Sequence, residues 1–225
     1  MSEFVDSLEV EFRSAANEAI MIQQKAYMKG QFEYFGIKSP LRNELSKPFL
    51  HKDYLPPKEE LHNLTRELWE KPQRDFQYFA QTLCQKYVKG LEENDLELFE
   101  YMIVTKSWWD TIDFIASNLV GPLFIKFPHL RNKTIKKWMA TENMWLQRTC
   151  LLFQLKYKDE VDKDLLAKLI LELTGGKEFF INKAIGWSLR SYSRVDPDWV
   201  MEFVNSNELS NLSKREALKL IHRTT

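Results

Sequence analysis

Apolar residues recur three and four positions apart along most of the chain, which is the spacing of one face of an α-helix. The segment Asp75–Leu83 is an example. Alternating runs typical of strands are scarce, and only seven glycines occur among 225 residues. The pattern therefore predicts a chain that is nearly all helix.

The helical segments also repeat along the chain. A charged residue marks the expected start of each inner helix, at Asp75, Asp110, Arg148, Lys183 and Arg215, with gaps of 35, 38, 35 and 32 residues. A second amphipathic segment precedes four of these starts: Leu61–Trp69, Leu96–Val104, Leu130–Met139 and Leu165–Leu173. Helix pairs that repeat every ~35–45 residues are typical of an α-solenoid of HEAT type. We expect an all-α superhelix that forms a single domain over residues 1–225, with Lys52–Lys58 as a loop inside it.

The inner helices of such a stack line a concave surface, where Arg148, Lys183 and Arg215 would form a basic ridge with Arg190 farther along its helix. Regularly spaced cations of this kind can follow a phosphate backbone. Residues 1–104 carry 13 Lys and Arg against 18 Asp and Glu, whereas residues 105–225 carry 19 against 14. We therefore expect a concave DNA-binding groove, although the same residues would be ordinary surface charges in a protein of another function.

Composition narrows the class of protein. The apolar fraction of 44% and the charged fraction of 28% are those of a soluble globular chain. No apolar run approaches the roughly 18 residues of a membrane span, and the acidic start Met1–Asp6 does not resemble a secretory signal. Cys84 and Cys150 lie in apolar helical patterns, and the four histidines are scattered. We expect a cytoplasmic protein without membrane contact, metal or cofactor.

Two adjacent tryptophans beside two aspartates, Trp108-Trp109-Asp110 and then Asp113, form the most informative motif. Trp109 and Asp113 are four residues apart and share a helix face, where an indole beside a carboxylate suits a cationic ligand. Neighbouring tryptophans cannot share that face, so we expect Trp108 to be packed and Asp110 to cap the helix. Trp187 lies among basic residues. We expect a core role for four others: Trp69, Trp138, Trp145 and Trp199.

Longer stretches strengthen this reading: Tyr27–Lys29, Phe35–Ile37, Arg66–Trp69, Val104–Asp110, Trp145–Arg148, Phe153–Lys158, Lys177–Ile181, Lys183–Trp187 and Leu212–Ala217. Over these stretches the chain resembles the AlkD family of alkylpurine DNA glycosylases, which are built from HEAT-like repeats. The resemblance covers nearly the whole chain.

The resemblance implies catalytic roles for Trp109, Asp113 and Trp187. It implies DNA-binding roles for Arg148, Tyr27, Lys183, Arg190, Lys38, Ser39, Arg42, Lys214 and Arg215. Asn43 stands where the family often has another arginine, and the family's basic C-terminal tail is short or absent. We therefore expect a weaker hold on DNA, with catalysis retained.

The family excises purines that alkylation at N3 or N7 has made cationic. Such a base is already a good leaving group, so a fixed carboxylate at Asp113 would need only to stabilise the developing sugar cation and orient water. Trp109 and Trp187 would add cation–π contacts of about 0.5–2 kcal/mol each. The family resemblance also implies that the base is not flipped into a pocket, and no lysine is conspicuous as a nucleophile.

The sequence thus predicts a monomeric, monofunctional DNA glycosylase that acts on alkylated purines in double-stranded DNA. One alternative is a non-catalytic HEAT-like module that binds distorted or branched DNA. Another is a HEAT scaffold for proteins, which would not need the arrangement of Trp109, Asp113 and Trp187.

Overall fold

The computed structural model describes residues 2–221, and its contacts divide the chain into two compact units, Met1–Leu91 and Glu92–Thr225. No β-strand forms among the described residues, although an isolated bridge joins Glu33 to Gln73. The prediction of an all-helical chain is confirmed, while the single domain over residues 1–225 stays a prediction.

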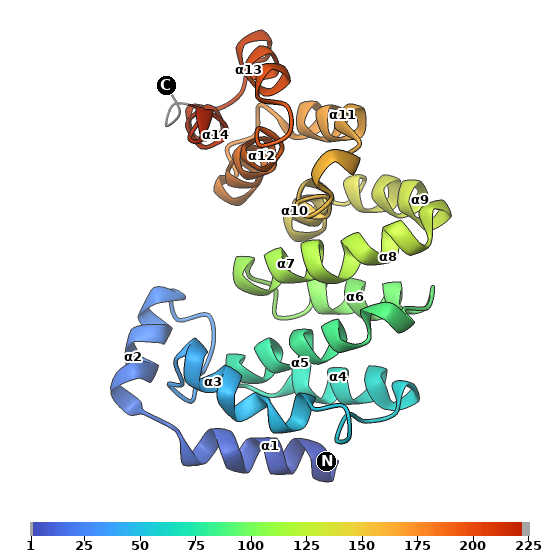
Figure 1. The fold of residues 1–225 in the computed structure, drawn as a ribbon. Coiled ribbons are helices and arrows are strands. Elements are labelled where there is room, and N and C mark those ends of the chain that lie inside the picture. The colour runs from blue at the N-terminus through green and yellow to red at the C-terminus, as the bar shows by residue number, and fades with distance from the viewer. Residues whose placement is uncertain (1, 222–225) are drawn as a thin grey trace. The chain divides into compact units, whose positions relative to one another are not determined.

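The first unit contains five α-helices and short 3₁₀ turns in its described part (Figure 1). The α-helices are α1 (Glu3–Ser14), α2 (Glu18–Tyr27), α3 (Ser39–Ser46), α4 (Leu61–Glu70) and α5 (Arg74–Lys86), and the 3₁₀ turns are Pro48–Leu50, Lys58–Glu60 and Val88–Gly90. The stretch between the first two of these turns has no helix, as expected for the loop at Lys52–Lys58.

Aromatic side chains fill the core of the first unit. Phe12, Phe35 and Phe76 are buried, and the ring centroids of Phe35 and Phe76 lie 5.5 Å apart. The segment that carries Phe35 passes so close to α2 that a Cβ on Gly36 would lie 1.9 Å from the carbonyl oxygen of Asn17. The φ of +81° at Gly36 also favours glycine. Glycine is therefore required inside the Phe35–Ile37 stretch.

Helix α2 differs from the other helices of this unit because none of its residues is buried. Its last residue, Tyr27, is 72% exposed. Polar contacts hold the helix in place: the Gln24 side-chain amide donates to the Ile37 carbonyl at 2.9 Å, and the Asn17 carboxamide caps the first turn. These hydrogen bonds, together with the burial of Met28 directly after the helix, thus position Tyr27.

The second unit is a stack of helix pairs. Its helices are α6 (Asp95–Val104), α7 (Trp109–Ile115), α8 (Gly121–Lys126), α9 (Pro128–Met139), α10 (Met144–Leu152), α11 (Lys163–Leu173), α12 (Phe179–Tyr192), α13 (Pro197–Ser206) and α14 (Asn211–Ala217). A π-helical segment at Ala116–Val120 joins α7 to α8, and a 3₁₀ turn forms at Lys158–Glu160. Helix α7 packs on α10, α10 on α12, and α12 on α14, so these four form one inner row (Figure 1). The outer segments predicted from the sequence match α4, α6, α9 and α11 to within a few residues.

A carboxamide at the fourth residue of an inner helix closes three of the helix pairs. Gln77 donates to the carbonyls of Leu68, Trp69 and Lys71, Gln147 to those of Met139 and Thr141, and Asn182 to those of Gly176 and Glu178. The last carbonyls of a helix have no partner inside it. These side chains supply partners at or just beyond the end of the preceding outer helix.

The register of the repeat differs from the one expected from sequence. Asp75 and Asp110 are the second residues of α5 and α7, whereas Arg148, Lys183 and Arg215 are the fifth residues of α10, α12 and α14. The residues at the fifth position are Tyr78, Asp113, Arg148, Lys183 and Arg215, spaced by 35, 35, 35 and 32 residues. The predicted alignment is therefore wrong by three positions at Asp75 and Asp110, because charge alone does not mark a helix start.

Most of the predicted core residues are buried. Trp69 and Trp138 are fully buried, and Trp145 is 9% exposed. Trp199 is only half-buried, stacked on Phe203 with ring centroids 5.1 Å apart. Both cysteines are free and buried, and burial raises the pKa of the Cys150 thiol. Within residues 2–221, no helix has the length and apolar character needed to cross a bilayer.

Candidate functional site

Helix α7 places Trp109 and Asp113 on one face, one turn apart. The helix begins after Trp108, whose backbone is extended with φ −160° and ψ 156° and whose side chain makes no capping hydrogen bond. Asp110 lies in the first turn rather than at the N-cap, so its predicted capping role is wrong. A carboxylate in a first turn still interacts favourably with the helix dipole.

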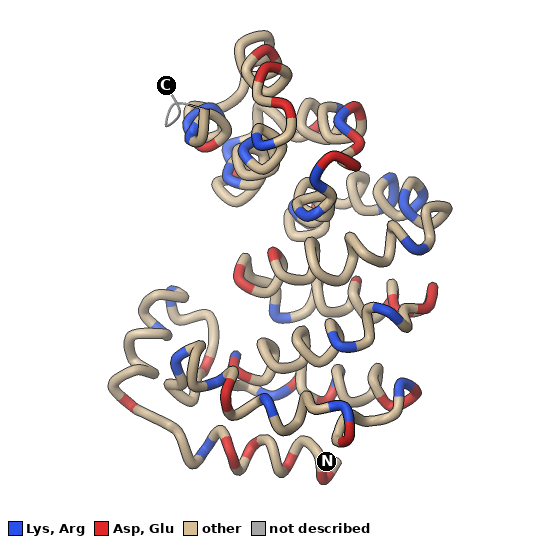
Figure 2. Tube along the Cα trace, in the orientation of Figure 1, with Lys and Arg blue, Asp and Glu red and all other residues tan. Residues whose placement is uncertain are grey.

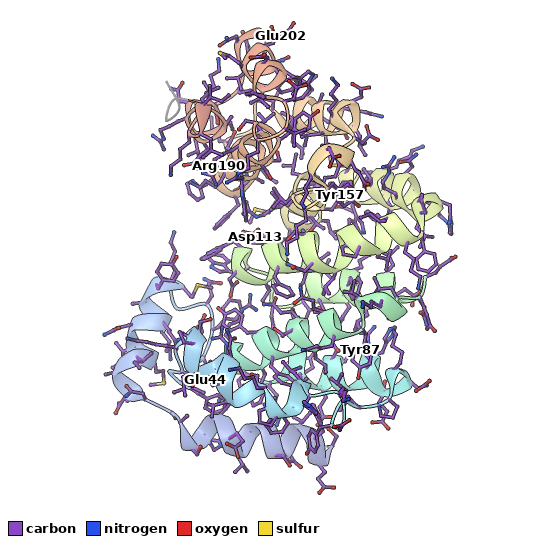
Figure 3. The ribbon with its side chains drawn as sticks, in the orientation of Figure 1. Glu44, Tyr87, Asp113, Tyr157, Arg190 and Glu202 are labelled. Carbon is purple, nitrogen blue, oxygen red and sulfur yellow. The ribbon has the colours of Figure 1, made fainter. Side chains whose placement is uncertain are left out.

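Two nitrogens of the Arg148 guanidinium, on α10, donate hydrogen bonds to the two oxygens of the Asp113 carboxylate. The Arg148 Nε donates to Asp113 Oδ1 at 2.7 Å, and Nη2 donates to Oδ2 at 2.9 Å. The two side chains are 3% and 15% exposed respectively, so the pair is largely screened from water. Paired charge-assisted hydrogen bonds fix the orientation of a carboxylate as well as its position. Asp113 is therefore a rigid acceptor on α7 (Figure 3).

Burial governs the acidity of Asp113. Removal from water raises the pKa of this carboxyl above its ordinary value, and the nearby Asp110 carboxylate raises it further. The hydrogen bonds and charge of Arg148 oppose that rise. Asp113 thus becomes protonated at a higher pH than an exposed aspartate would.

The structure gives Arg148 an environment that the sequence did not predict. Its third group, Nη1, donates to the carbonyl of Phe180 on α12, so Arg148 joins α7, α10 and α12. The expected exposure on a basic ridge is wrong, because the side chain is buried between these helices. Its charge is directed at Asp113.

An aromatic cluster supports this junction. Trp108, Trp145 and Phe180 lie with ring centroids 5.1–5.8 Å apart, and the Phe180 ring lies 5.9 Å from the Arg148 guanidinium carbon. Trp108 packs in this cluster as expected, although it is half-buried rather than fully buried. Its indole N–H is enclosed without a hydrogen-bond partner.

Helix α12 contributes Trp187, which is half-buried. Lys183 and Arg190 lie four residues before it and three residues after it, so all three share one face. Both cations bind Glu216 of α14, at 2.8 Å from the Lys183 Nζ and 2.7 Å from the Arg190 Nη1. Figure 2 shows cationic residues on α12 and α14, and Figure 3 labels Arg190.

Comparison with known proteins identifies the family. The model of the DNA alkylation repair enzyme family matches residues 8–221. The chain belongs to the DNA alkylation repair enzyme family.

A solved structure of similar fold agrees with the assignment. It is described as a predicted DNA alkylation repair enzyme from Enterococcus faecalis, with 34% sequence identity and a TM-score of 0.84 over 91% of this chain and 95% of that one. No match was found among curated proteins. The similarity confirms the α-solenoid class, and the family assigns this enzyme a role in DNA repair.

The remaining predicted DNA-binding residues of the second unit in this repair enzyme vary in exposure. Lys183 and Arg190 are partly exposed, Lys214 is half-buried and Arg215 is exposed. Among residues 2–221, no group of three or more His, Cys, Asp and Glu side chains is arranged to hold a metal ion.

The first unit of the repair enzyme carries the other predicted DNA-binding residues. Lys38 is the N-cap of α3, Ser39 begins the helix, and both are exposed. Arg42, one turn later, is only 13% exposed at its side chain and lies over the Tyr78 ring at 4.2 Å. Tyr27 is highly exposed at the end of α2. Lys38, Ser39 and Arg42 therefore share the first turns of α3, and Arg42 is turned toward the interior of its unit.

Sequence reasoning missed two partners of the predicted site in this repair enzyme. Glu216 lies within the matched stretch Leu212–Ala217, and its place one residue after the fifth position of α14 is a usable signal. The Phe180 carbonyl also leaves no trace in the sequence, because it acts through its backbone.

Proposed function

We propose that this enzyme hydrolyses the N-glycosidic bond of cationic N3- and N7-alkylated purines in duplex DNA, as a monofunctional glycosylase. The observation that carries the proposal is the Asp113 carboxylate, held on both oxygens by Arg148 and one helical turn from Trp109. A fixed carboxylate in a site of low exposure is suited to stabilise a cation that forms only in the transition state.

The proposed reaction needs little proton transfer to the leaving group. As the bond between C1′ and the purine nitrogen breaks, its electron pair goes to the cationic base, which leaves neutral. Positive charge then builds on the deoxyribose, where Asp113 stabilises it. Water adds to C1′ and gives up a proton, for which Asp113 is the proposed acceptor. The products are a free purine and an abasic site.

Trp109 and Trp187 would hold the sugar and adjacent backbone against Asp113. An aromatic face attracts a cation with about 0.5–2 kcal/mol, depending on its exposure to water. Both indoles are half-buried, so part of each side chain remains exposed to solvent. This arrangement recognises the reacting sugar, and the base needs no pocket of its own.

Phosphate contacts are proposed from both units. Lys183, Arg190, Lys214 and Arg215 would serve in the second unit, and Tyr27, Lys38, Ser39 and Arg42 in the first. Arg148 changes role relative to the expectation from sequence. With its guanidinium bound to Asp113 and Phe180, it is proposed as a positioning residue. The enzyme is proposed to act as a monomer, and the reaction uses water without a metal or cofactor.

Release of 7-methylguanine from methylated duplex DNA tests the activity. We expect wild type to release the base, and Asp113→Asn to lose about 10²–10³-fold in rate, the range for removal of a preorganised electrostatic group. The variant should still bind the duplex, because Asp113 contributes no phosphate contact. If wild type released no purine while both proteins bound DNA equally, a non-catalytic module for distorted or branched DNA would replace the glycosylase.

A further inference from the structure

Glu216 of α14 is a carboxylate whose two oxygens bind different cations of α12. Oε1 lies 2.8 Å from the Lys183 Nζ, and Oε2 accepts from the Arg190 Nη1 at 2.7 Å. The Glu216 side chain is 10% exposed, whereas those of Lys183 and Arg190 are 38% and 22% exposed. The anion is therefore enclosed, and the two cations remain accessible to solvent.

The position of Glu216 is fixed by close packing between the two helices. A Cβ on Gly186 would lie 2.5 Å from the Glu216 Cβ and 2.8 Å from the Ser213 carbonyl oxygen. The Ser213 hydroxyl also donates to the Asn182 carbonyl at 2.8 Å. The Glu216 side chain therefore packs against the backbone of Gly186, the residue that precedes Trp187 in the chain. A flexible surface side chain would have no such constraint.

The three charged groups act together beside Trp187. Two cations and one carboxylate leave a net charge of +1, where the cations alone would present +2. Lys183 lowers the pKa of the Glu216 carboxyl below its ordinary value, with Arg190 and Lys219 adding to the effect. Glu216 thus stays ionised throughout the neutral range and keeps neutralising its partners.

We propose that Glu216 limits how strongly Lys183 and Arg190 bind duplex phosphates, and so sets the electrostatic part of DNA binding. Binding to any duplex rises with the number of phosphates that cations neutralise, regardless of sequence or damage. Recognition of a lesion instead depends on the proposed contacts of Trp109, Asp113 and Trp187. Glu216 therefore weakens binding to damaged and undamaged duplex by a similar factor and leaves the lesion contacts unchanged. This inference rests on the proposed function for its ligand, duplex DNA.

Glu216→Gln tests the inference, because glutamine keeps the shape and one acceptor but removes the charge. We expect the variant to bind undamaged duplex a few-fold more tightly than wild type. Its slope of log affinity against log salt should steepen by about 0.9 for each additional phosphate that the released cations neutralise. The affinity for abasic-site duplex should rise by a similar factor, because its phosphates are the same. Equal affinity and slope in the two proteins would overturn the inference.

Glu100→Gln is the matched control. Glu100 also bridges two donors, the Lys137 Nζ at 2.6 Å and the Trp138 indole at 2.9 Å, but on the outer helices α6 and α9. We expect this variant to keep the wild-type salt slope. Thermal unfolding of both variants separates lost packing from changed binding, since a purely structural role would lower the melting temperature without steepening the slope.

A second variant identifies the cations that Glu216 restrains. In a Lys183→Gln background, Glu216→Gln should have a smaller effect on the salt slope, because only Arg190 remains to be released. An undiminished effect would contradict the assignment. The base-release assay on wild type is independent of these measurements. If wild type released no purine but Glu216→Gln still steepened the salt slope, the glycosylase proposal would fail and the inference would stand. If wild type released purine and the slope of Glu216→Gln were unchanged, only the inference would fail.

Discussion

Each unit contains a largely buried aspartate that faces an arginine, and the two pairs differ in hydrogen bonding and in exposure. Asp75 in the first unit is 0% exposed; its Oδ2 accepts from the Phe35 amide at 2.9 Å, and its Oδ1 lies 3.8 Å from Arg42 without a hydrogen bond. Asp113 in the second unit is 15% exposed and has both oxygens bonded to Arg148. Burial raises the pKa of both carboxyls.

The difference teaches how a structural aspartate is distinguished from a candidate catalytic one. Asp75 holds a loop through a backbone amide and is inaccessible to a substrate. Asp113 has a strong cationic partner that favours its ionised form, some exposure, and an indole one turn away. A raised pKa by itself is found at both positions and does not mark a site.

Removal of the arginine should distinguish the two pairs most strongly. Arg148→Met leaves the Asp113 carboxylate buried without its partner, so we expect a loss of about 3–5 kcal/mol in the free energy of unfolding. Arg42→Met breaks a longer contact without a hydrogen bond and should cost less. Urea unfolding of both variants measures the difference. Equal losses would mean that the bidentate geometry adds nothing.

The pH dependence of base release should follow Asp113 and not Asp75. The proposed reaction needs the Asp113 anion, and its raised pKa means that protonation occurs at a higher pH than for an ordinary aspartate. We therefore expect the rate to fall on acidification through a pKa above that of an ordinary aspartate, up to tenfold per pH unit below it. The rate against pH for wild type and Asp75→Asn checks this. If Asp75→Asn shifted the acidic side of the rate profile, the carboxyl that controls the rate would be Asp75 and not Asp113.

Asp75→Asn should have the smallest effect on stability. Because the folded pKa of Asp75 is raised, the folded protein binds its proton more readily than the unfolded chain does, and Asp75 contributes more stability as pH falls toward that pKa. At neutral pH the neutral asparagine should therefore change the free energy of unfolding by no more than about 1 kcal/mol. On acidification wild type should gain relative to the variant. A relative loss would show that Asp75 is stabilised as an anion.

The sequence predicted the helices well, and it placed Trp109 and Asp113 on one helix face. Both predictions rest on local properties, which are the apolar spacing and the step of four residues between Trp109 and Asp113. It did not predict the partner of Asp113. Arg148 lies 35 residues later, and its burial depends on how α7, α10 and α12 pack. The same limit applies to Lys183 and Arg190, which looked like independent surface charges although Glu216 binds both.

The repeat contained a usable signal that charge alone obscured. Asp113 and Arg148 both occupy the fifth position of adjacent inner helices, so the structural register places them side by side. Aligning Asp110 instead of Asp113 shifted the acidic position by three residues, so the pairing of Asp113 with Arg148 was not apparent from the sequence. The fixed 35-residue step, once anchored on the structure, explains why this contact joins neighbouring repeats.

Helix α2, which buries none of its residues, has a consequence for the thermodynamics of association. A ten-residue helix is marginal by itself, and none of the side chains within α2 is fully buried, so local opening of α2 should cost less free energy than local opening of α4 or α5. A ligand that engages Tyr27 should therefore order the helix further, at a cost in conformational entropy that grows with temperature. The first unit thus presents its exposed aromatic on a lightly packed helix, whereas α12 presents Trp187 on a helix packed closely against α14.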